Sequence, residues 1–296
     1  MKKRIGLIIS ILIIFIVSIC LTGCGGNKEK EEVYKEEQDN KEEIYNKVEV
    51  SEKKQYVVAS ENDFTLEEKN GEMIISSYTG NDSYIIIPTE IQGIPVTIID
   101  SETFEDSSIK GVIISDSVVK IEERAFSFAV DLQEVKLGKN VKELGEETFS
   151  WCENLENVTF NEGLEVIGEA AFAYDGKLSK IDFPSTVKTI EINAFALTDL
   201  REVNIPSTVK TIGKYAFSYC ENLKTITIEE GVTTMGSGIA YNCEKLEKIN
   251  IPKSVVNHDG SPVINCPTAK IHIIKDSEIY KYYKENYANY PNLVIE

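Results

Sequence analysis

Six cysteines are the residues of this 296-residue chain whose spacing most invites a chemical interpretation. Two lie near the N-terminus, and the others are Cys152, Cys220, Cys243 and Cys266. The last three are 23 residues apart, unlike the closely spaced ligand pairs of structural zinc sites. Free cysteine is among the most buried residue types, so we interpret the four as a column of buried, reduced thiols. A disulfide between neighbours is the alternative, and it requires suitable side-chain directions.

The other reactive side chains form no catalytic pattern. His258 and His272 lie in no metal or nucleophile motif, and the phosphate-loop, nucleophile-elbow and metalloprotease motifs are absent from the sequence. Carboxylate pairs such as Glu122/Glu123 read as solvated charges, because glycoside hydrolysis requires a cleft and one carboxyl group with a raised pKa. The sequence therefore predicts that the protein is not an enzyme and has no cofactor and no metal site.

A repeated sequence motif determines the positions of these side chains. It reads Val-x-x-Ile-x-x-x-Ala-Phe-x-x-Cys-x-x-Leu-x-x-Ile-x-Ile and is clearest over residues 209–228. Its phenylalanines are Phe104, Phe126, Phe149, Phe172, Phe195 and Phe217, spaced 22 or 23 residues apart. Ala240 occupies the position of the next phenylalanine. A fixed period of this length predicts a solenoid, in which each unit buries its apolar face against its neighbours.

Each unit divides into two halves. The Leu-x-x-Ile-x-Ile half alternates and is rich in β-branched residues, which predicts a strand with one face inward. Prolines such as Pro184 and Pro206 follow it directly and end strand pairing. The Val-x-x-Ile half, with its Ala-Phe pair, predicts a short extended piece and a turn of 3₁₀ or α-helix on the opposite side. Near the C-terminus, apolar residues at helical spacing over 276–287 predict a helix that Asp276 or Ser277 caps.

These seven units resemble the leucine-rich repeat superfamily and, within it, the BspA-like class of bacterial and protozoan surface proteins. No Asn ladder follows the strand, where Gly163 and Gly231 stand instead, and this favours the BspA-like class over the familiar horseshoes. The resemblance implies a β-rich solenoid of the α/β class. Its right-handed superhelix would carry one parallel sheet on the concave face and short 3₁₀ or α turns on the other side. Caps are expected over about 63–95 and 267–296, since an uncapped solenoid exposes its core.

Two outward-facing sets of residues are candidate binding surfaces. The first is the polar face of the predicted sheet, which could equally be a merely solvated surface. Its members are Lys136, Thr159, Asp182, Asn204, Thr227, Asn250, Glu134, Asn157, Lys180, Glu202, Thr225 and Lys248. The second is an aromatic stripe two residues after the repeated phenylalanine, which either binds a ligand or shields the core. It comprises Phe128, Trp151, Tyr174 and Tyr219, with Leu197 in register.

The N-terminal residues predict secretion and anchoring. Lys2, Lys3 and Arg4 precede an apolar run, as in a secretory signal; a transmembrane anchor is the alternative. Leu-Thr-Gly-Cys at 21–24 resembles the bacterial lipoprotein box, which implies a signal peptide over 1–23 and lipidation of Cys24. Residues 24–62 then form a charged, flexible tether, and 63–296 form the repeat domain. Few Arg against many Lys and Ile favours an AT-rich, Gram-positive source.

Charge limits the partners. The formal charge of −18 becomes −21 once the three basic residues of the signal are removed. Such a surface repels phosphate backbones, so no nucleic-acid binding is expected, and the membrane is reached through the lipid. The resemblance implies a cell-surface lipoprotein on the extracellular face of the cell membrane that binds an extracellular protein or glycan as an adhesin or interaction module. The alternative is a structural or accessory envelope protein that assembles with other envelope components.

Overall fold

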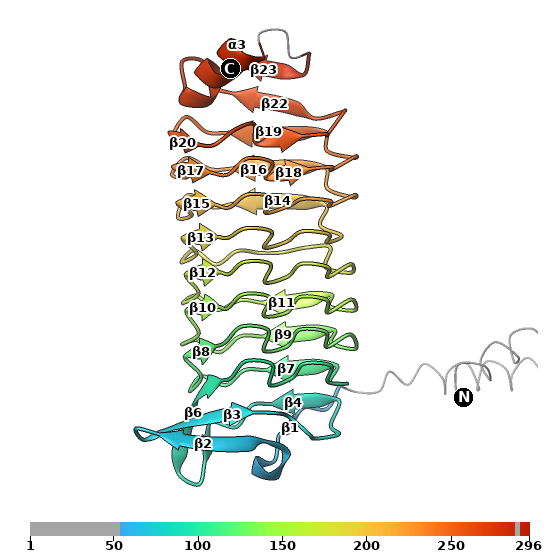
Figure 1. The fold of residues 1–296 in the computed structure, drawn as a ribbon, viewed down its shortest axis with the longest axis vertical. Helices are drawn as coiled ribbons and strands as arrows, with labels where there is room; N and C mark the ends of the chain where they lie inside the picture. The colour runs from blue at the N-terminus through green and yellow to red at the C-terminus, as the bar shows by residue number, and fades with distance from the viewer. Residues whose placement is uncertain (1–53, 288–290) are drawn as a thin grey trace, which may run out of the picture. The chain divides into compact units, whose positions relative to one another are not determined.

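The computed structural model describes residues 54–287 and 291–296, and in it the repeats stack as successive turns of a solenoid (Figure 1). One side of the solenoid carries parallel strands formed by the predicted Leu-x-x-Ile-x-Ile segments. They make two five-stranded sheets, β1-β4-β7-β9-β11 and β14-β16-β19-β22-β23. The bounds are β1 Val57–Val58, β4 Tyr84–Ile86, β7 Gly111–Ile113, β9 Glu134–Lys136, β11 Asn157–Thr159, β14 Glu202–Ile205, β16 Thr225–Ile228, β19 Lys248–Ile251, β22 Lys270–Ile273 and β23 Leu293–Ile295. The predicted parallel-sheet solenoid is confirmed.

A second parallel ladder lies on the opposite side, where the sequence predicted a short extended piece and a turn of 3₁₀ or α-helix. Its core is a series of two-residue strands: β8 Lys120–Ile121, β10 Glu143–Leu144, β12 Val166–Ile167, β13 Thr189–Ile190, β15 Thr211–Ile212, β17 Thr234–Met235 and β20 Asn257–His258. Longer strands begin it: β2 Thr65–Lys69, β3 Glu72–Ser76 and β6 Ile94–Ile99, with β5 Glu90–Ile91 pairing β6. A further short pair is β18 Ala240–Tyr241 with β21 Val263–Ile264. The predicted extended piece is therefore a short strand, and its pairing into a second ladder was not predicted, since strands of two residues show no alternation in a sequence.

The turn between the two ladders is held by backbone bonds to the next repeat. The amides of Arg124, Phe126 and Phe128 donate to the carbonyls of Glu146, Thr148 and Ser150 at 2.8, 2.8 and 2.9 Å. Most of these turns have two residues with positive φ that are not glycine, for example Arg124 at 54° and Phe128 at 57°. This left-handed conformation costs about 1–2 kcal/mol per residue, and the inter-repeat hydrogen bonds offset that cost. No helix forms here.

Six phenylalanine rings form a continuous column inside the solenoid. Successive rings from Phe104 to Phe217 lie 4.6–5.6 Å apart between centroids, with planes inclined by 2–19°. All six side chains are fully buried. Because every repeat places its ring at the same height, each ring packs on the rings of the repeats before and after it. The column thus joins the repeats through burial and ring stacking together.

The strand stack is interrupted at one repeat. Residues 180–183 lie where a strand is due between β11 and β14, but they have no strand assignment. Phe183 still packs edge-on against Phe195, with ring centroids 5.7 Å apart. The following step of the phenylalanine column, from Phe195 to Phe217, is one of the two 22-residue steps in the chain. The core therefore continues through this repeat while the outer sheet does not.

The two ends of the domain differ from the repeats. At the N-terminal end β2 and β3 form an antiparallel hairpin after the short 3₁₀ helix η1 Glu61–Asp63. At the C-terminal end helix α3 Glu278–Asn286 is N-capped by Ser277, as predicted, and buries Ile279 and Tyr283. The capping role of residues 63–95 and 267–296 stays a prediction. β1, which pairs β4 in register, lies before the predicted domain boundary at residue 63.

The cysteine column has the predicted form in the structure. Cys152, Cys220, Cys243 and Cys266 are buried and free. Each thiol donates to a carbonyl of the preceding repeat, for example Cys152 to Phe126 at 3.2 Å and Cys243 to Phe217 at 3.1 Å. Burial raises the pKa of Cys220 to about 11. Because thiolates are the reactive form, the raised pKa values of Cys152 and Cys220 make them packing groups, whereas a hydrogen bond from Cys243 lowers the pKa of Cys266.

Asp175 occupies the place of a cysteine in this column. Its side chain is fully buried, and its Oδ1 accepts a hydrogen bond from the Cys152 amide at 2.9 Å. Its other carboxyl oxygen has no hydrogen-bond partner among the described residues. Burial raises the pKa of Asp175 well above its usual range. Burial among thiols and apolar side chains therefore favours the neutral form of this carboxyl group.

The signal peptide, Cys24 and most of the predicted tether lie outside the described residues. Their assignments over 1–23 and 24–62 remain predictions.

The phenylalanine column predicts a large cost for removing a central ring. Phe172→Ala should lower the free energy of unfolding by about 3–5 kcal/mol, because the rings of Phe149 and Phe195 lose their partner and a cavity remains. Urea unfolding followed by circular dichroism measures this. Tyr174→Asn is the matched control in the same repeat: its side chain is exposed, and its effect should stay within about 1 kcal/mol. Equal losses in the two variants would contradict the role of the column.

Asp175 predicts an unusual dependence of stability on pH. Its folded pKa is raised above its unfolded value of about 3.9, so the folded state binds more protons over the intervening range. The contribution of Asp175 is then fully present below about pH 4 and is lost as pH rises through the folded pKa. Asp175→Asn keeps an oxygen for the Cys152 amide and removes the titration. We expect it to stabilise the protein at pH 8 by about 1–3 kcal/mol and to have little effect near pH 4.

Thermal unfolding at pH 4, 6 and 8 tests this expectation. The exposed Asp182→Asn is the control for loss of one negative charge. A stability gain that is the same at all three pH values, or one shared by the control, would contradict the expectation.

Candidate functional site

The predicted sheet face is exposed or half-exposed along its whole length. In the first sheet Glu134 and Lys136 stand in register with Asn157 and Thr159. In the second sheet two rows are in register, Glu202–Thr225–Lys248 and Asn204–Thr227–Asn250. The structure therefore brings the candidate residues together as two polar patches. Their binding role stays a prediction.

Lys180 and Asp182 belong to neither patch. They lie in the interruption between the two sheets, and the Nζ of Lys180 bonds the Oδ2 of Asp182 at 2.6 Å. Their side chains are 75% and 78% exposed, so this ion pair contributes little to stability. The continuous twelve-residue face expected from the sequence is thus divided by a break in strand pairing.

Side-chain contacts of Tyr56 and Glu296 cover the two extremities of the face. The Tyr56 hydroxyl donates to Glu134 Oε1 at 2.6 Å, and the Tyr56 ring packs edge-on against Tyr84. Burial and this bond raise the pKa of Tyr56. At the other extremity His272 Nδ1 lies 2.6 Å from Glu296 Oε1. Among residues 54–287 and 291–296, the part of the face without such contacts therefore lies between them.

The aromatic stripe forms one row of side chains on the turns. The planes of Phe128, Trp151 and Tyr174 are inclined by only 9° at each step, and their centroids lie 5.8 and 3.9 Å apart. Leu197 follows in register, and then Tyr219, which packs against Tyr241 at 5.4 Å. Phe128, Tyr174, Leu197 and Tyr219 are 37–44% exposed. We call Phe128, Trp151, Tyr174, Leu197 and Tyr219 the aromatic row.

The backbone fixes the outward direction of the aromatic row. All five residues have positive φ, between 57° and 68°. In the next two repeats the same place is taken by Asn242 and Asn265, both with φ of 54°. Asparagine tolerates this conformation well, whereas aromatic residues are uncommon in it. Large rings at these positions are therefore unrelated to any local backbone preference, and they leave apolar surface exposed.

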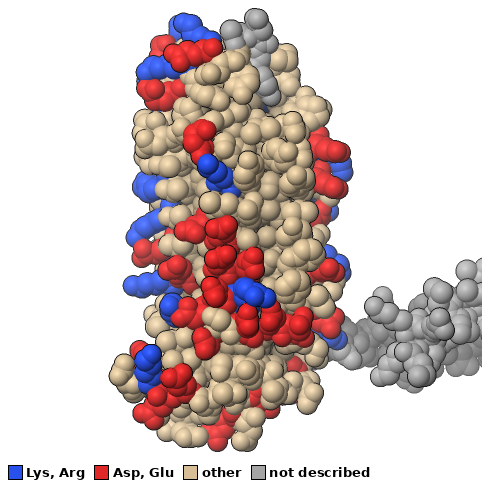
Figure 2. All heavy atoms as spheres, viewed as in Figure 1, with Lys and Arg blue, Asp and Glu red and all other residues tan. Residues whose placement is uncertain are grey.

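A band of acidic side chains lies at the N-terminal end of the turns that carry the aromatic row (Figure 2). It includes Glu122, Glu123, Glu143 and Glu146, which line a hollow of about 390 Å³. The band continues to Glu169, whose pKa is raised by partial burial and by the nearby charges of Glu146, Glu191 and Glu147. This band repels anionic partners from that surface.

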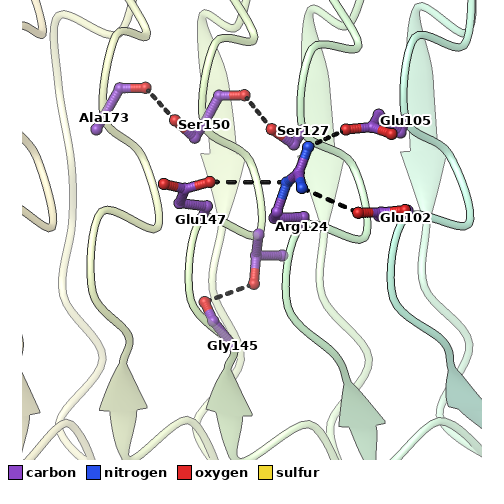
Figure 3. A network of polar contacts seen from close by, with 9 residues as sticks. Glu102, Glu105, Arg124, Ser127, Gly145, Glu147, Ser150 and Ala173 are labelled. Carbon is purple, nitrogen blue, oxygen red and sulfur yellow. Dashed lines mark hydrogen bonds and ion pairs between the residues drawn. The ribbon is translucent and has the colours of Figure 1, made fainter.

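Arg124 lies within the acidic band and joins three repeats (Figure 3). Its guanidinium contacts Glu102 at 2.9 Å and Glu147 at 3.7 Å, and it also bonds Glu105. Beside it the Ser127 and Ser150 hydroxyls donate to the carbonyls of Ser150 and Ala173 at 3.3 and 3.2 Å. These contacts connect consecutive repeats, so we assign Arg124 a structural role.

Two features of this region were missed by the sequence analysis. Asp175 could have been found by aligning the repeats, because it lies 23 residues after Cys152. A hollow beside the aromatic row, near Gly176 and Leu197, depends on side-chain packing that no single repeat reveals. Over residues 54–287 and 291–296 no group of three or more His, Cys, Asp or Glu side chains could hold a metal ion. In the same part of the chain no helix is long and apolar enough to cross a membrane.

Several solved structures are similar to this fold. The leucine-rich repeat protein of T. pallidum is 21% identical over 76% of this chain and 93% of that one, with a TM-score of 0.54. A leucine rich cell surface protein of Faecalibacterium prausnitzii A2-165 is 23% identical over 73% of this chain and 76% of that one, with a TM-score of 0.47. The pneumococcal vaccine antigen PcpA is 16% identical over 81% and 98%, with a TM-score of 0.38. At these identities the T. pallidum structure shows the fold alone.

The family comparison goes further than the structures. A search of curated proteins gave no significant match. The BspA type leucine rich repeat region matches residues 78–198 and 165–293, in six copies. Leucine-rich repeat folds are typically non-enzymatic scaffolds that bind other proteins, and membership indicates a protein-interaction or surface module. The chain belongs to the BspA type leucine-rich repeat family.

Proposed function

We propose that the protein is a lipid-anchored cell-surface module that binds an extracellular protein. The observation that carries this proposal is the aromatic row, a line of large apolar side chains of which Phe128, Tyr174, Leu197 and Tyr219 are 37–44% exposed. Exposed apolar surface of this kind is characteristic of interaction sites, and aromatic residues are enriched at the centres of protein interfaces. The predicted lipid at Cys24 would hold the module at the membrane.

The geometry of the row favours a protein over a glycan. Sugar rings pack their C–H groups against an open aromatic face. Both faces of Trp151 are covered, by Phe128 on one side and Tyr174 on the other. The row therefore presents mainly ring edges, which carry partial positive charge and pack well against the side chains and carbonyls of a protein.

The polar sheet face supplies the surroundings of such an interface. In three repeats the row residue precedes the strand by six residues, as in Phe128 and Glu134 or Trp151 and Asn157, and Leu197 precedes its strand by five. An apolar centre with polar neighbours is the usual composition of a protein interface. Most of the affinity is expected from the aromatic row, because a few aromatic anchors commonly dominate binding energy.

Substituting the row with asparagine tests the proposal without changing the backbone conformation. The triple variant Phe128→Asn, Tyr174→Asn and Tyr219→Asn reproduces the residue found at Asn242 and Asn265. The control triple variant Val58→Thr, Val119→Thr and Val256→Thr removes exposed apolar side chains elsewhere, which are 62%, 45% and 54% exposed. Both should remain folded.

The full chain in neutral detergent is screened against purified extracellular-matrix proteins, serum proteins and a glycan array. We expect at least one protein to bind, and the row variant to bind it at least about tenfold more weakly than the control does. Trp151, the single tryptophan of the chain, should change its fluorescence on binding. Binding that the row variant retains, or folded protein that binds none of the proteins, would contradict the proposal. In the latter case co-purification with envelope proteins would favour the accessory role.

A further inference from the structure

The aromatic row contains a hollow of about 270 Å³ at the position of Leu197. Its lining includes Gly176, Leu197, Asp199, Tyr219 and Glu221, together with Asn222. A hollow of this size accommodates one long side chain rather than a folded element. The hollow lies within the aromatic row, which is the surface proposed to bind the protein partner.

Three departures from the repeat pattern create this hollow. Gly176 stands where the preceding repeat has Glu153 and where the second repeat after it has Glu221, and a Cβ added to Gly176 would meet no atom within 4 Å. Leu197 stands where the flanking repeats carry the rings of Tyr174 and Tyr219. The third departure is a missing residue, since Thr198-Asp199-Leu200 replaces the four-residue Cys-Glu-Asn-Leu of 220–223. Such coincident departures distinguish this place from every other along the row.

The lining combines apolar surface with negative charge. Leu197 and Tyr219 are 37% and 44% exposed and form the apolar part. Tyr219 has its ring contact with Tyr241 in the following repeat, while Leu197 takes the place of a ring in the preceding repeat. Tyr219 also lines the hollow, so the exposed part of its ring is available to a flat group.

Two carboxylates and no cation belong to the lining. Glu221 is exposed and makes no ion pair within the described part of the chain. Asp199 accepts a hydrogen bond from Asn222, and Arg201 approaches it at 3.7 Å from outside the lining. Lys245, also outside, bonds Asn222 at 2.6 Å. The Glu221 carboxylate is thus left to pair with a charge from elsewhere.

We propose that this hollow receives an arginine side chain of the protein partner, an inference that rests on the proposed function and specifies its contact. A guanidinium group is planar, stacks on aromatic rings and forms paired hydrogen bonds with carboxylates. It is also less strongly hydrated than an ammonium group, which suits a half-apolar hollow. The aliphatic part of the arginine would lie on Leu197, and the guanidinium would reach Tyr219 and Glu221.

Short synthetic peptides test this contact directly. The probes are Ac-Gly-Arg-Gly-NH₂, its lysine counterpart and its citrulline counterpart, in which a neutral urea replaces the guanidinium. They are titrated into the isotope-labelled full chain in neutral detergent, and the NMR signals of the Gly176 amide and the Leu197 methyl groups are followed. We expect saturable shifts with the arginine peptide, and binding roughly tenfold weaker for the lysine and citrulline peptides.

Two variants with a matched control locate the site. Leu197→Tyr installs the residue of the flanking repeats, fills the hollow without changing charge, and should abolish the response at Gly176. Glu221→Gln should weaken arginine binding roughly tenfold. Glu244→Gln removes the same charge at the same place in the next repeat and should leave binding unchanged. An arginine response that survives Leu197→Tyr, equal effects of Glu221→Gln and Glu244→Gln, or equal binding of arginine and lysine would overturn the proposal.

The outcomes separate this inference from the proposed function. If an extracellular protein binds through the aromatic row and Leu197→Tyr leaves that binding intact, the row is confirmed and the arginine contact is overturned. If the arginine peptide binds at Gly176 while no extracellular protein is captured, the contact stands and the proposed function fails.

Discussion

The hydrogen bonds between successive repeats are the constraint on which the rest of the structure depends. Backbone amides on the strands and on the turns donate to carbonyls of adjacent repeats, so residues 22 or 23 positions apart are held side by side. Whatever side chain occupies a given place in the repeat must then pack against its own counterpart. The phenylalanine column, the thiol column and the aromatic row are all consequences of this register.

The same constraint explains the unusual backbone of the turns. Positive φ at residues such as Arg124 and Phe128 would be unfavourable in an isolated peptide. Here it directs alternate amides toward the next repeat, and each turn is supported by neighbours on two sides. Arg124 adds side-chain contacts to Glu102, Glu105 and Glu147 across the same repeats. Local conformational cost and inter-repeat bonding are therefore coupled.

The sequence predicted the parts of this fold that follow from apolar periodicity. The Phe and Leu positions identified the core, and the alternation in segments such as 202–205 identified the sheet. The sequence also predicted a short extended piece in the other half of the repeat but not its pairing into a second ladder, because strands such as Thr211–Ile212 are too short to show alternation. The left-handed turn residues were equally hidden, since Phe128 and Tyr174 have no intrinsic preference for positive φ.

For the candidate site, the sequence identified the exposed aromatic and polar residues but did not predict how they are arranged in space. The break at Lys180 and Asp182 depends on backbone pairing between repeats, which side-chain patterns do not report. The hollow at Leu197 arises from a missing residue and a missing side chain in adjacent repeats. These two absences form one hollow only because the adjacent repeats lie side by side in the fold.

The directions of the inter-repeat bonds also affect how this molecule would respond to mechanical load. Bonds between parallel strands lie across the strands and hence along the stacking axis of the repeats. Tension applied along that axis would load the hydrogen bonds between one pair of repeats at a time. The repeats would then separate in succession rather than all together. The break in strand pairing at residues 180–183 leaves fewer outer bonds at that rung, so separation would begin there. A solenoid built this way would lengthen under tension while its remaining repeats kept their structure.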